Sequence, residues 1–544
     1  AFLRGIVDAL NAEVALGSVS SVDDGVSWLG FTYLFTRLKK APLIYGLDAH
    51  DLLSDPALLQ RRKHWIMHAA NILVQHGMAT MDAQTGALHP TNVGRIASRY
   101  YLSYKTIEIF HERLRNGLRE ADALDLMSRA SDFAQVALRE SEEAELTRLL
   151  EQVPCEVGGG VATAPGKVNI LLQAHVSYLP MDDFALISDA RYVAQNAGRI
   201  LLALFDLSLD RGYGVSAASF LQLAKAVDRR VWPFEHPMKQ CTHLSPDILH
   251  KIATYADELE VSQIRALPLG PLADLLRANE RIAKLVHEAA ERFPAMGLRV
   301  AVRPMPGSFV CLQVRLQPAF IWDDRLHGTS LPLIVWIEDA AQRVVFSDRI
   351  MIRPPSARSE SYEWEVQVPL SSPVTRPAAE EAYSVVWSSL HWLAAEGRVD
   401  VTLDTVACPP PTPLTPLFDV PLLQLQTLSE SAMTTALREA RGLSTLNAMQ
   451  TQVLHTLAHT RSSVLLCAPH GTGKTTVALF AVGRALAQGA VVWVAPDDAR
   501  ATLAVRLGRG VVRGHRSRCT GIRCAAWMGV GRSVACRVVA PASA

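Results

Sequence analysis

Several features are missing from this 544-residue sequence, and each absence argues against a class of protein or of binding site. No apolar run is long enough to cross a membrane, and no basic-then-apolar signal segment opens the chain. The eight cysteines contain no Cys-x-x-Cys pair, which fits a reducing compartment and argues against a structural zinc. The composition is instead that of a soluble globular protein, and the length predicts three or more domains.

Acidic residues and lysine are absent from residues 501–544, which carry eight arginines. Without this segment, 46 basic side chains stand against 53 acidic ones, a balance of −7. Nucleic-acid binding would therefore need a local basic groove. From about Gly508 the chain is rich in Gly, Arg, Ala and Cys, so we expect residues 508–544 to be disordered; a basic nucleic-acid-binding tail is the alternative.

A phosphate-binding pattern is the strongest feature that is present. The run from Val464 to Thr476 predicts a strand, then a loop, then a helix. Gly471, Thr472 and Gly473 form the loop, in which glycines let successive N–H groups converge on phosphate oxygens.

Two residues after the loop complete the predicted ATP site. Lys474 is expected to reach the β- and γ-phosphates, and the Thr475 hydroxyl to bind Mg²⁺. Ala468 stands where the common pattern has glycine, a variant that helicases of superfamily two use. The sequence therefore predicts ATP and Mg²⁺ as cofactors.

Periodicity predicts the elements that precede this loop. Apolar spacing predicts helices over residues 28–38 and 64–77, followed by a hairpin over 81–89, which together make a winged helix plausible. Short helices punctuated by proline and glycine over 244–292 indicate helix-hairpin-helix units. From about 297 to 406 the apolar pattern alternates, which predicts an immunoglobulin-like β-sandwich. The proline-rich run after Cys408 predicts a stiff linker. A second strand is expected at 491–496.

Seven segments follow one another in the order of a known family: Leu10-Asn-Ala-Glu, Leu29-Gly-Phe-Thr-Tyr-Leu, Gly94-Arg-Ile-Ala-Ser-Arg-Tyr-Tyr, Lys167-Val-Asn-Ile-Leu-Leu-Gln, Tyr192-Val-Ala-Gln-Asn-Ala-Gly-Arg, Val231-Trp and Trp322-Asp-Asp-Arg-Leu-His-Gly. Over residues 1 to about 505 the chain resembles the large two-cassette helicases of superfamily two. These repeat a RecA pair, a winged helix and a Sec-sixty-three homology unit. Because the chain opens at Ala1 in mid-helix, we expect a fragment that runs from the first cassette's winged helix into the second cassette's RecA domain.

The resemblance implies a multidomain α+β fold that ends in a truncated α/β RecA-like P-loop domain. The expected domains are a winged helix (1–90), a helical bundle (91–230), a helix-hairpin-helix (231–295), a β-sandwich (296–406), a linker (407–430), the RecA-like domain (431–507) and an aberrant tail (508–544).

The resemblance also implies an ATP-dependent 3′-to-5′ helicase acting on single-stranded RNA or DNA. The expected partners are proteins of a multisubunit complex, without a membrane, in the nucleus and/or the cytoplasm.

Three further residues take expected roles from the resemblance. Gln450 corresponds to the glutamine that reads the adenine edge of ATP, although Ala448 and Met449 depart from the usual neighbours. Gln195 and Arg199 lie one helical turn apart on a helix that resembles the family's nucleic-acid ratchet, with Leu202 where a basic residue is usual. A buried helix in which Arg199 pairs with an acid is the alternative.

The family's Asp-Glu-x-His box, which holds Mg²⁺ and activates water, does not occur after Thr476. We therefore expect the chain as given to bind ATP without hydrolysing it, and no catalytic residue is assigned. A catalytically inactive scaffold, with the Sec-sixty-three unit as a protein-interaction module, is the competing hypothesis.

Overall fold

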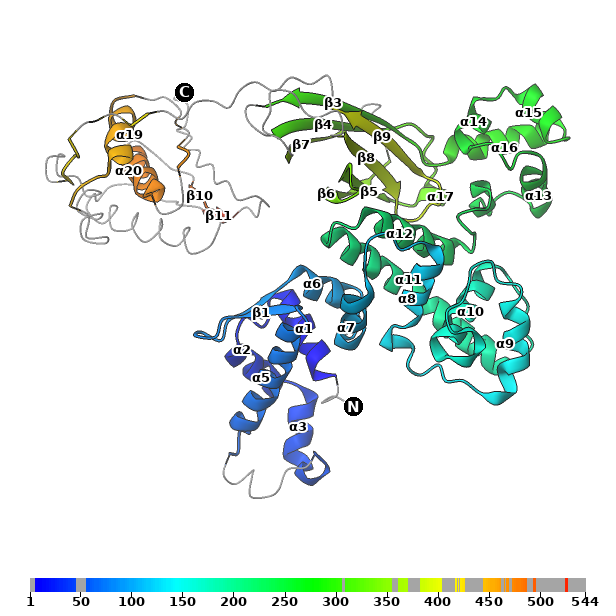
Figure 1. Cartoon of the computed structure of the whole chain (residues 1–544), viewed down its shortest axis with the longest axis horizontal. Coiled ribbons are helices and arrows are strands. Elements are labelled where there is room, and N and C mark those ends of the chain that lie inside the picture. Colours follow the sequence, from blue (N-terminus) through cyan, green and yellow to red (C-terminus); the bar gives the residue numbers. More distant parts are fainter. Residues whose placement is uncertain are drawn as a thin grey trace. The chain divides into compact units, whose positions relative to one another are not determined.

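The computed structural model of the chain divides into two compact units, Ala1–Pro411 and Thr412–Ala544 (Figure 1). In the first unit the structure describes residues 5–45, 55–305, 309–354, 361–369 and 382–403. In the second it describes 416–417, 419, 421–425, 444–460, 464, 466–468, 472–486, 493–495 and 524–526. The division falls within the segment expected to be a linker, most of which lies outside the described residues.

The N-terminal part of the first unit combines short helices with one hairpin. Its elements are α1 (Ile6–Leu16), α2 (Val22–Gly30), α3 (Tyr33–Lys40), η2 (Pro42–Tyr45), α5 (Leu59–Gln75), β1 (Ala79–Met81), β2 (Leu88–Pro90) and α6 (Asn92–Arg99). The predicted hairpin is confirmed, since Met81 pairs antiparallel with Leu88. The single helix expected over 28–38 is wrong: α2 ends at Gly30, and the Thr32 hydroxyl accepts from the Phe35 N–H to begin α3.

A bundle of longer helices follows. Its members are α7 (Tyr104–Arg113), α8 (Glu120–Ser128), α9 (Glu143–Leu150), α10 (Ala164–Val176), α11 (Phe184–Asp210) and α12 (Gly214–Arg229). The 27-residue α11 is the longest of the described helices, and the Asp183 carboxylate begins it by accepting from the N–H groups of Ala185 and Leu186.

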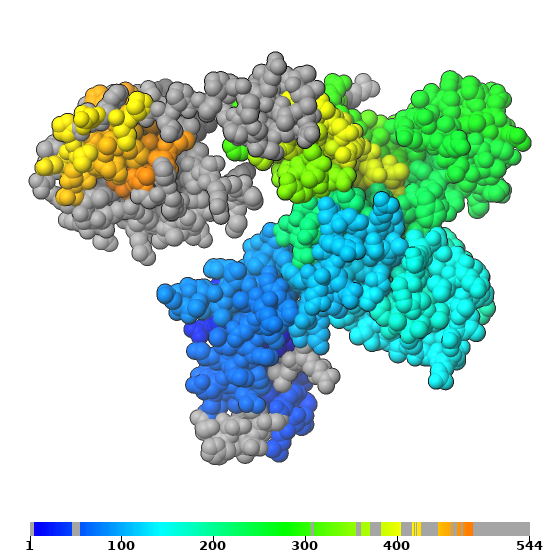
Figure 2. Space-filling view, viewed as in Figure 1, coloured from blue at the N-terminus to red at the C-terminus, as the bar shows by residue number. Residues whose placement is uncertain are grey.

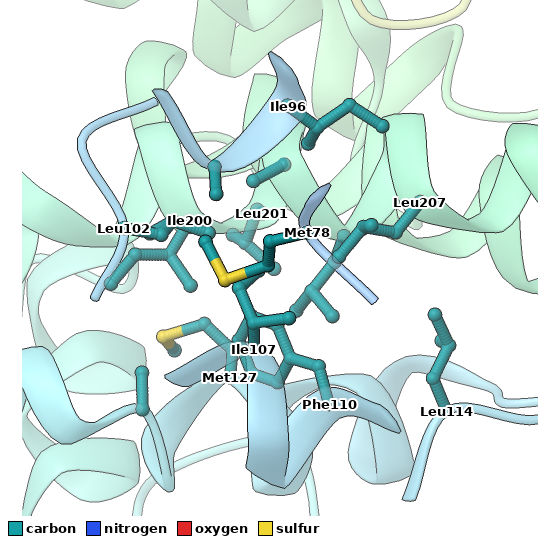
Figure 3. Packing of buried hydrophobic residues seen from close by; sticks show 14 of the residues in the cluster. Met78, Ile96, Leu102, Ile107, Phe110, Leu114, Met127, Ile200, Leu201 and Leu207 are labelled. Atoms are coloured by element: carbon teal, nitrogen blue, oxygen red, sulfur yellow. The ribbon is translucent and has the colours of Figure 1, made fainter. Parts of the chain in front are cut away.

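Apolar side chains pack α11 against the N-terminal part. Ile200 and Leu201 of α11 meet Met78, Ile107 and Phe110 in one buried cluster (Figure 3). Burial of this kind contributes about 1.5–3 kcal/mol for each large side chain. The winged-helix part and the bundle thus share one core.

Four short helices then lead into the sheets, as the punctuated pattern predicts. They are α13 (Pro246–Tyr255), α14 (Val261–Ala266), α15 (Leu269–Leu275) and α16 (Glu280–Arg292). Pro246 stands in the first turn of α13, where its missing N–H leaves no hydrogen bond unmade.

The alternating segment forms two antiparallel sheets. One has the order β3-β4-β7, from β3 (Met296–Pro304), β4 (Phe309–Pro318) and β7 (Tyr362–Pro369). The other has the order β6-β5-β8-β9, from β5 (Leu331–Asp339), β6 (Val344–Ile352), β8 (Ala382–Ser389) and β9 (Glu396–Thr402), with α17 (Asp324–His327) between the two. Buried side chains of both sheets, such as Leu312 and Val335, belong to one cluster, so the sheets enclose a common core.

One buried carboxylate joins three parts of this unit. Asp206 of α11 is 8% exposed and accepts from Arg99 of α6 at 3.3 Å, from the Tyr100 hydroxyl at 3.0 Å, and from Arg349 of β6. In the space-filling view the blue N-terminal part and the light-blue to cyan start of the bundle form a continuous surface (Figure 2).

The second unit contains α19 (Ala448–His459), α20 (Lys474–Leu486) and two short parallel strands, β10 (Trp493–Ala495) and β11 (Cys524–Ala526). The predicted strand at 491–496 is confirmed by β10, whereas no strand includes residues 464 or 466–468, so that prediction is wrong for these residues. Of the tail expected to be disordered, residues 524–526 pair with β10, and the remaining residues of 508–544 lie outside the described residues. Within the described residues, no helix is both long and apolar enough to span a bilayer.

A buried lysine couples the bundle to the second sheet. Lys225 of α12 is 1% exposed, donates to the Ser388 hydroxyl at 3.0 Å, and lies 3.6 Å from the Glu396 carboxylate. Burial lowers the pKa of Lys225 to about 8, from an ordinary value of 10.5, although Glu396 opposes the shift.

This environment predicts a pH dependence of stability. Between pH 8 and 10.5 the unfolded chain binds more protons at Lys225 than the folded one, so the free energy of unfolding should rise with pH. Urea titrations of the wild type should show this rise, up to about 3 kcal/mol, relative to Lys225→Met. Lys239→Met, which removes a partly exposed lysine paired with Glu235, is the control. Parallel profiles for the wild type and Lys225→Met would contradict the prediction.

Candidate nucleotide and nucleic-acid sites

The start of α19 is tied to the loop before α20. Asn447 and Gln450 form a reciprocal capping box, each side-chain oxygen accepting from the other residue's backbone N–H at 2.9 Å. The Asn447 amide then donates to the Thr472 carbonyl at 2.9 Å, and the Gln450 amide to the Gly473 carbonyl at 3.3 Å. Because Gln450 is only 5% exposed, the capping box contacts the loop from its buried side.

The backbone at Gly473 requires glycine. Its φ of 88° lies in the left-handed region, and a Cβ there would stand 2.2 Å from the Gln450 amide nitrogen. Helix α20 begins directly afterwards at Lys474, whose amine donates to the Ala468 carbonyl. Lys474 therefore reaches back across the loop from the first turn of the helix.

These contacts bring together Thr472, Gly473, Lys474 and Thr475 at a helix N-terminus, an arrangement that fits a polyphosphate. Thr475 lies partly exposed in the first turn of α20. Gly471, the remaining predicted residue, lies outside the described residues. The oxygen and the nitrogen of the Gln450 side-chain amide both form hydrogen bonds within the chain, so its contact with adenine stays a prediction.

Sequence reasoning missed Asn447, which links the capping box to the loop. The Asn-x-x-Gln spacing before an apolar run is a recognised signal for a helix start and could have identified it. The contact to Thr472, in contrast, joins residues 25 positions apart and has no local signal.

In the first unit, the Arg199 side chain makes its hydrogen bonds to other residues of the chain. Its guanidinium donates to the Asp132 carboxylate at 2.8 Å, to the carbonyls of Tyr100 and Tyr101 at 2.8 and 3.1 Å, and to the Asn196 amide oxygen. The pairing with an acid, given above as the alternative, is therefore what the structure shows. A contact between Arg199 and nucleic acid stays a prediction.

The other two residues of the expected ratchet face differ in exposure. Gln195, one turn earlier on α11, is exposed, whereas Leu202 packs against the buried cluster. Within the described residues, no three His, Cys, Asp or Glu side chains are grouped so that they could hold a metal ion. Gln195 is thus the predicted nucleic-acid residue that remains available to a ligand.

Comparison with known proteins identifies the modules. Residues 90–402 match the Sec63 Brl domain, and residues 2–76 match a Winged Helix-turn-helix domain. The chain belongs to the Sec63 Brl domain family. The described helices from α6 and the two sheets lie within this match.

The chain is also similar to parts of longer proteins. The chain is 34% identical over 501 residues to activating signal cointegrator 1 complex subunit 3 of Dictyostelium discoideum, covering 91% of the chain and 22% of the relative. It is 33% identical over 502 residues to the DExH-box ATP-dependent RNA helicase DExH14 of Arabidopsis thaliana, covering 91% and 23%. Against the human U5 small nuclear ribonucleoprotein 200 kDa helicase it is 32% identical over 498 residues, covering 91% and 23%. The chain therefore spans less than a quarter of the length of these relatives.

The network around Arg199 predicts a structural role that can be measured. Arg199→Lys loses the planar fork that serves four partners, so the free energy of unfolding should fall by about 2–3 kcal/mol. Gln195→Ala, an exposed change on the same helix, should alter it by less than about 0.5 kcal/mol. Urea denaturation followed by circular dichroism measures both, and equal stability of the two variants would refute the structural role.

Proposed function

We propose that the chain is a segment of an ATP-dependent helicase that binds ATP through the loop before α20 and a single strand of RNA or DNA through its first unit. The proposal covers binding by this chain, not hydrolysis. The observation that carries it is the loop at Gly473, held by Asn447 and Gln450 at the start of a helix.

The ATP part follows from the chemistry of that loop. The ammonium of Lys474 and the first N–H groups of α20 would together neutralise phosphate charge, and the Thr475 hydroxyl would contact the accompanying Mg²⁺. Lys474 donates to a neutral carbonyl in the ligand-free chain, so a phosphate oxygen would replace a weaker acceptor. The fold around the loop is then the truncated RecA-like domain, and the two-sheet sandwich is of immunoglobulin-like type.

The nucleic-acid part is supported by α11 and by the relatives. DExH14 is named as an RNA helicase, and the U5 protein is named for a ribonucleoprotein, which favours RNA over DNA and a complex with other proteins, in the nucleus and/or the cytoplasm. Gln195 would contact the strand directly, while Arg199 holds the backbone of Tyr100 and Tyr101 in place beside it.

A scaffold is the second candidate, and one surface favours it. Phe31, Tyr33, Leu43 and Ile44 are between 73% and 91% exposed around α3 and η2, and large exposed apolar residues mark protein-binding surfaces. Binding of partner proteins without nucleotide, unaffected by loss of the ATP site, would favour this candidate.

Lys474→Ala should abolish most ATP binding. Titration of the chain with a fluorescent ATP analogue and Mg²⁺ should show a Kd about 10- to 100-fold higher than that of the wild type, because a charge-assisted contact to phosphate is lost. Lys284→Ala, which removes an exposed lysine of α16, is the matched control. Equal affinity of the wild type and Lys474→Ala would exclude the proposed site.

Gln195→Ala should weaken binding of a labelled single-stranded oligouridine by about threefold, the effect of one neutral hydrogen bond. Gln317→Ala removes an exposed glutamine from β4 and should leave the affinity unchanged. Fluorescence anisotropy measures both. If the two variants bind alike, the strand does not run along this face of α11.

A further inference from the structure

A cleft of about 590 Å³ is lined by residues of both the winged-helix match and the Sec63 Brl match. Its walls come from α1, from the turn between α6 and α7, and from the segment around Asp132. Neither the ATP site nor Gln195 contributes to its lining.

One wall of the cleft carries two polar side chains, Asn11 and Asp8. Asn11 is 2% exposed; its amide nitrogen donates to the Gly94 carbonyl, and its oxygen has no partner among the described residues. Asp8, beside it, accepts only from the Tyr104 N–H at 2.8 Å within the same part of the structure. The Asn11 oxygen has almost no accessible surface, so Asp8, which is partly exposed, is the acceptor that a ligand in the cleft can reach.

The charges of the lining favour a cation. Asp132 already pairs with Arg199, which leaves Asp8 and, at the exposed rim, Lys105. Burial raises the pKa of the Asp8 carboxyl above its usual value of 3.8 and Asp132 adds to this, because nearby positive charge does not offset the loss of water. An anionic ligand would meet two carboxylates in the cleft.

Tyr101 forms the outer wall in a strained conformation. Its φ is 53°, in the left-handed region that tyrosine rarely adopts, and it is 85% exposed. Arg199 holds it there by donating to the carbonyls of Tyr100 and Tyr101. Strain that is maintained at an exposed aromatic side chain points to a ligand.

A second tyrosine in the same chain shows what such a ring binds. Tyr178 has almost the same backbone, with φ 56°, and the guanidinium of Arg230 lies 3.5 Å from its ring centroid. Arg230 also donates to the His175 carbonyl at 2.8 Å. Tyr101 has a similar φ and larger exposure, with no described cation over its ring.

We infer that the cleft binds an arginine side chain of a protein partner, with the guanidinium stacked on Tyr101 and donating to the Asp8 carboxylate. The planar guanidinium suits this combination of an aromatic face and acceptors better than a lysine ammonium does. The inference goes beyond the proposed function and does not depend on ATP or nucleic-acid binding.

Binding of a short peptide to the full chain tests this inference. The probe is an acetylated, amidated pentapeptide with one central arginine, compared with the same peptide carrying neutral citrulline, in a ligand-observed NMR titration. The arginine peptide should bind with a Kd of about 1 mM or lower, and citrulline should weaken binding about tenfold, as expected for a charge-assisted contact.

Variants assign the site. Asp8→Asn keeps an oxygen for the Tyr104 N–H and should weaken arginine binding about tenfold. Tyr101→Gly removes the ring and relieves the left-handed strain, so it should fold and weaken binding about threefold. Tyr178→Gly, the matched change at the other tyrosine, should have no effect on the peptide.

Three results would overturn the inference: equal binding of the arginine and citrulline peptides, equal losses in Tyr101→Gly and Tyr178→Gly, or no binding at about 10 mM peptide. Guanosine monophosphate serves as the competing probe, because a guanine edge could also donate to Asp8. If it binds in an Asp8-dependent manner and the peptide does not, the occupant is a nucleobase and not an arginine.

Discussion

The arrangement of the first unit depends on one buried carboxylate. Asp206 receives donors from α6, from the adjoining Tyr100 and from β6, so the N-terminal part, the bundle and the sandwich meet at a single side chain of α11. Removing one partner from such a network leaves a buried charge uncompensated, which is more costly than losing a surface ion pair. The apolar cluster around Ile200 and Phe110 supplies most of the burial, while Asp206 specifies how the parts meet.

Arginines of the same unit act mainly as connectors. Arg199 holds two backbone carbonyls and Asp132 together, and Arg230 lies over the Tyr178 ring and donates to the His175 carbonyl. A planar fork of donors can join several acceptors at once, which a lysine cannot do with the same geometry. The helix expected to contact nucleic acid is therefore also the helix that organises the domain junction, and only its exposed positions remain available to a ligand.

The proposed ATP site illustrates how a helix start can position a loop. The capping box of Asn447 and Gln450 satisfies the first N–H groups of α19, and the same two amides hold the carbonyls of Thr472 and Gly473. Loop positioning and helix capping thus use one set of side chains, so a substitution at Gln450 is expected to act on the loop whether or not this residue touches adenine.

Local chemistry in the sequence determined the elements: the hairpin at 81–89, the alternating strands from 297, and the loop of Gly473 and Lys474 with the helix after it. These depend on turn residues and apolar period, which act over a few positions. Only the tertiary structure decided what Arg199 binds, that Gln450 faces the loop, and that Asp8, Asn11 and Tyr101 line one cleft. Arg199 and Asp132, for example, are 67 positions apart, and no periodicity or propensity encodes which of many acids a distant arginine will meet. That choice follows from the packing of whole helices, in which burial removes water and leaves each polar group only the partners that the fold brings within reach.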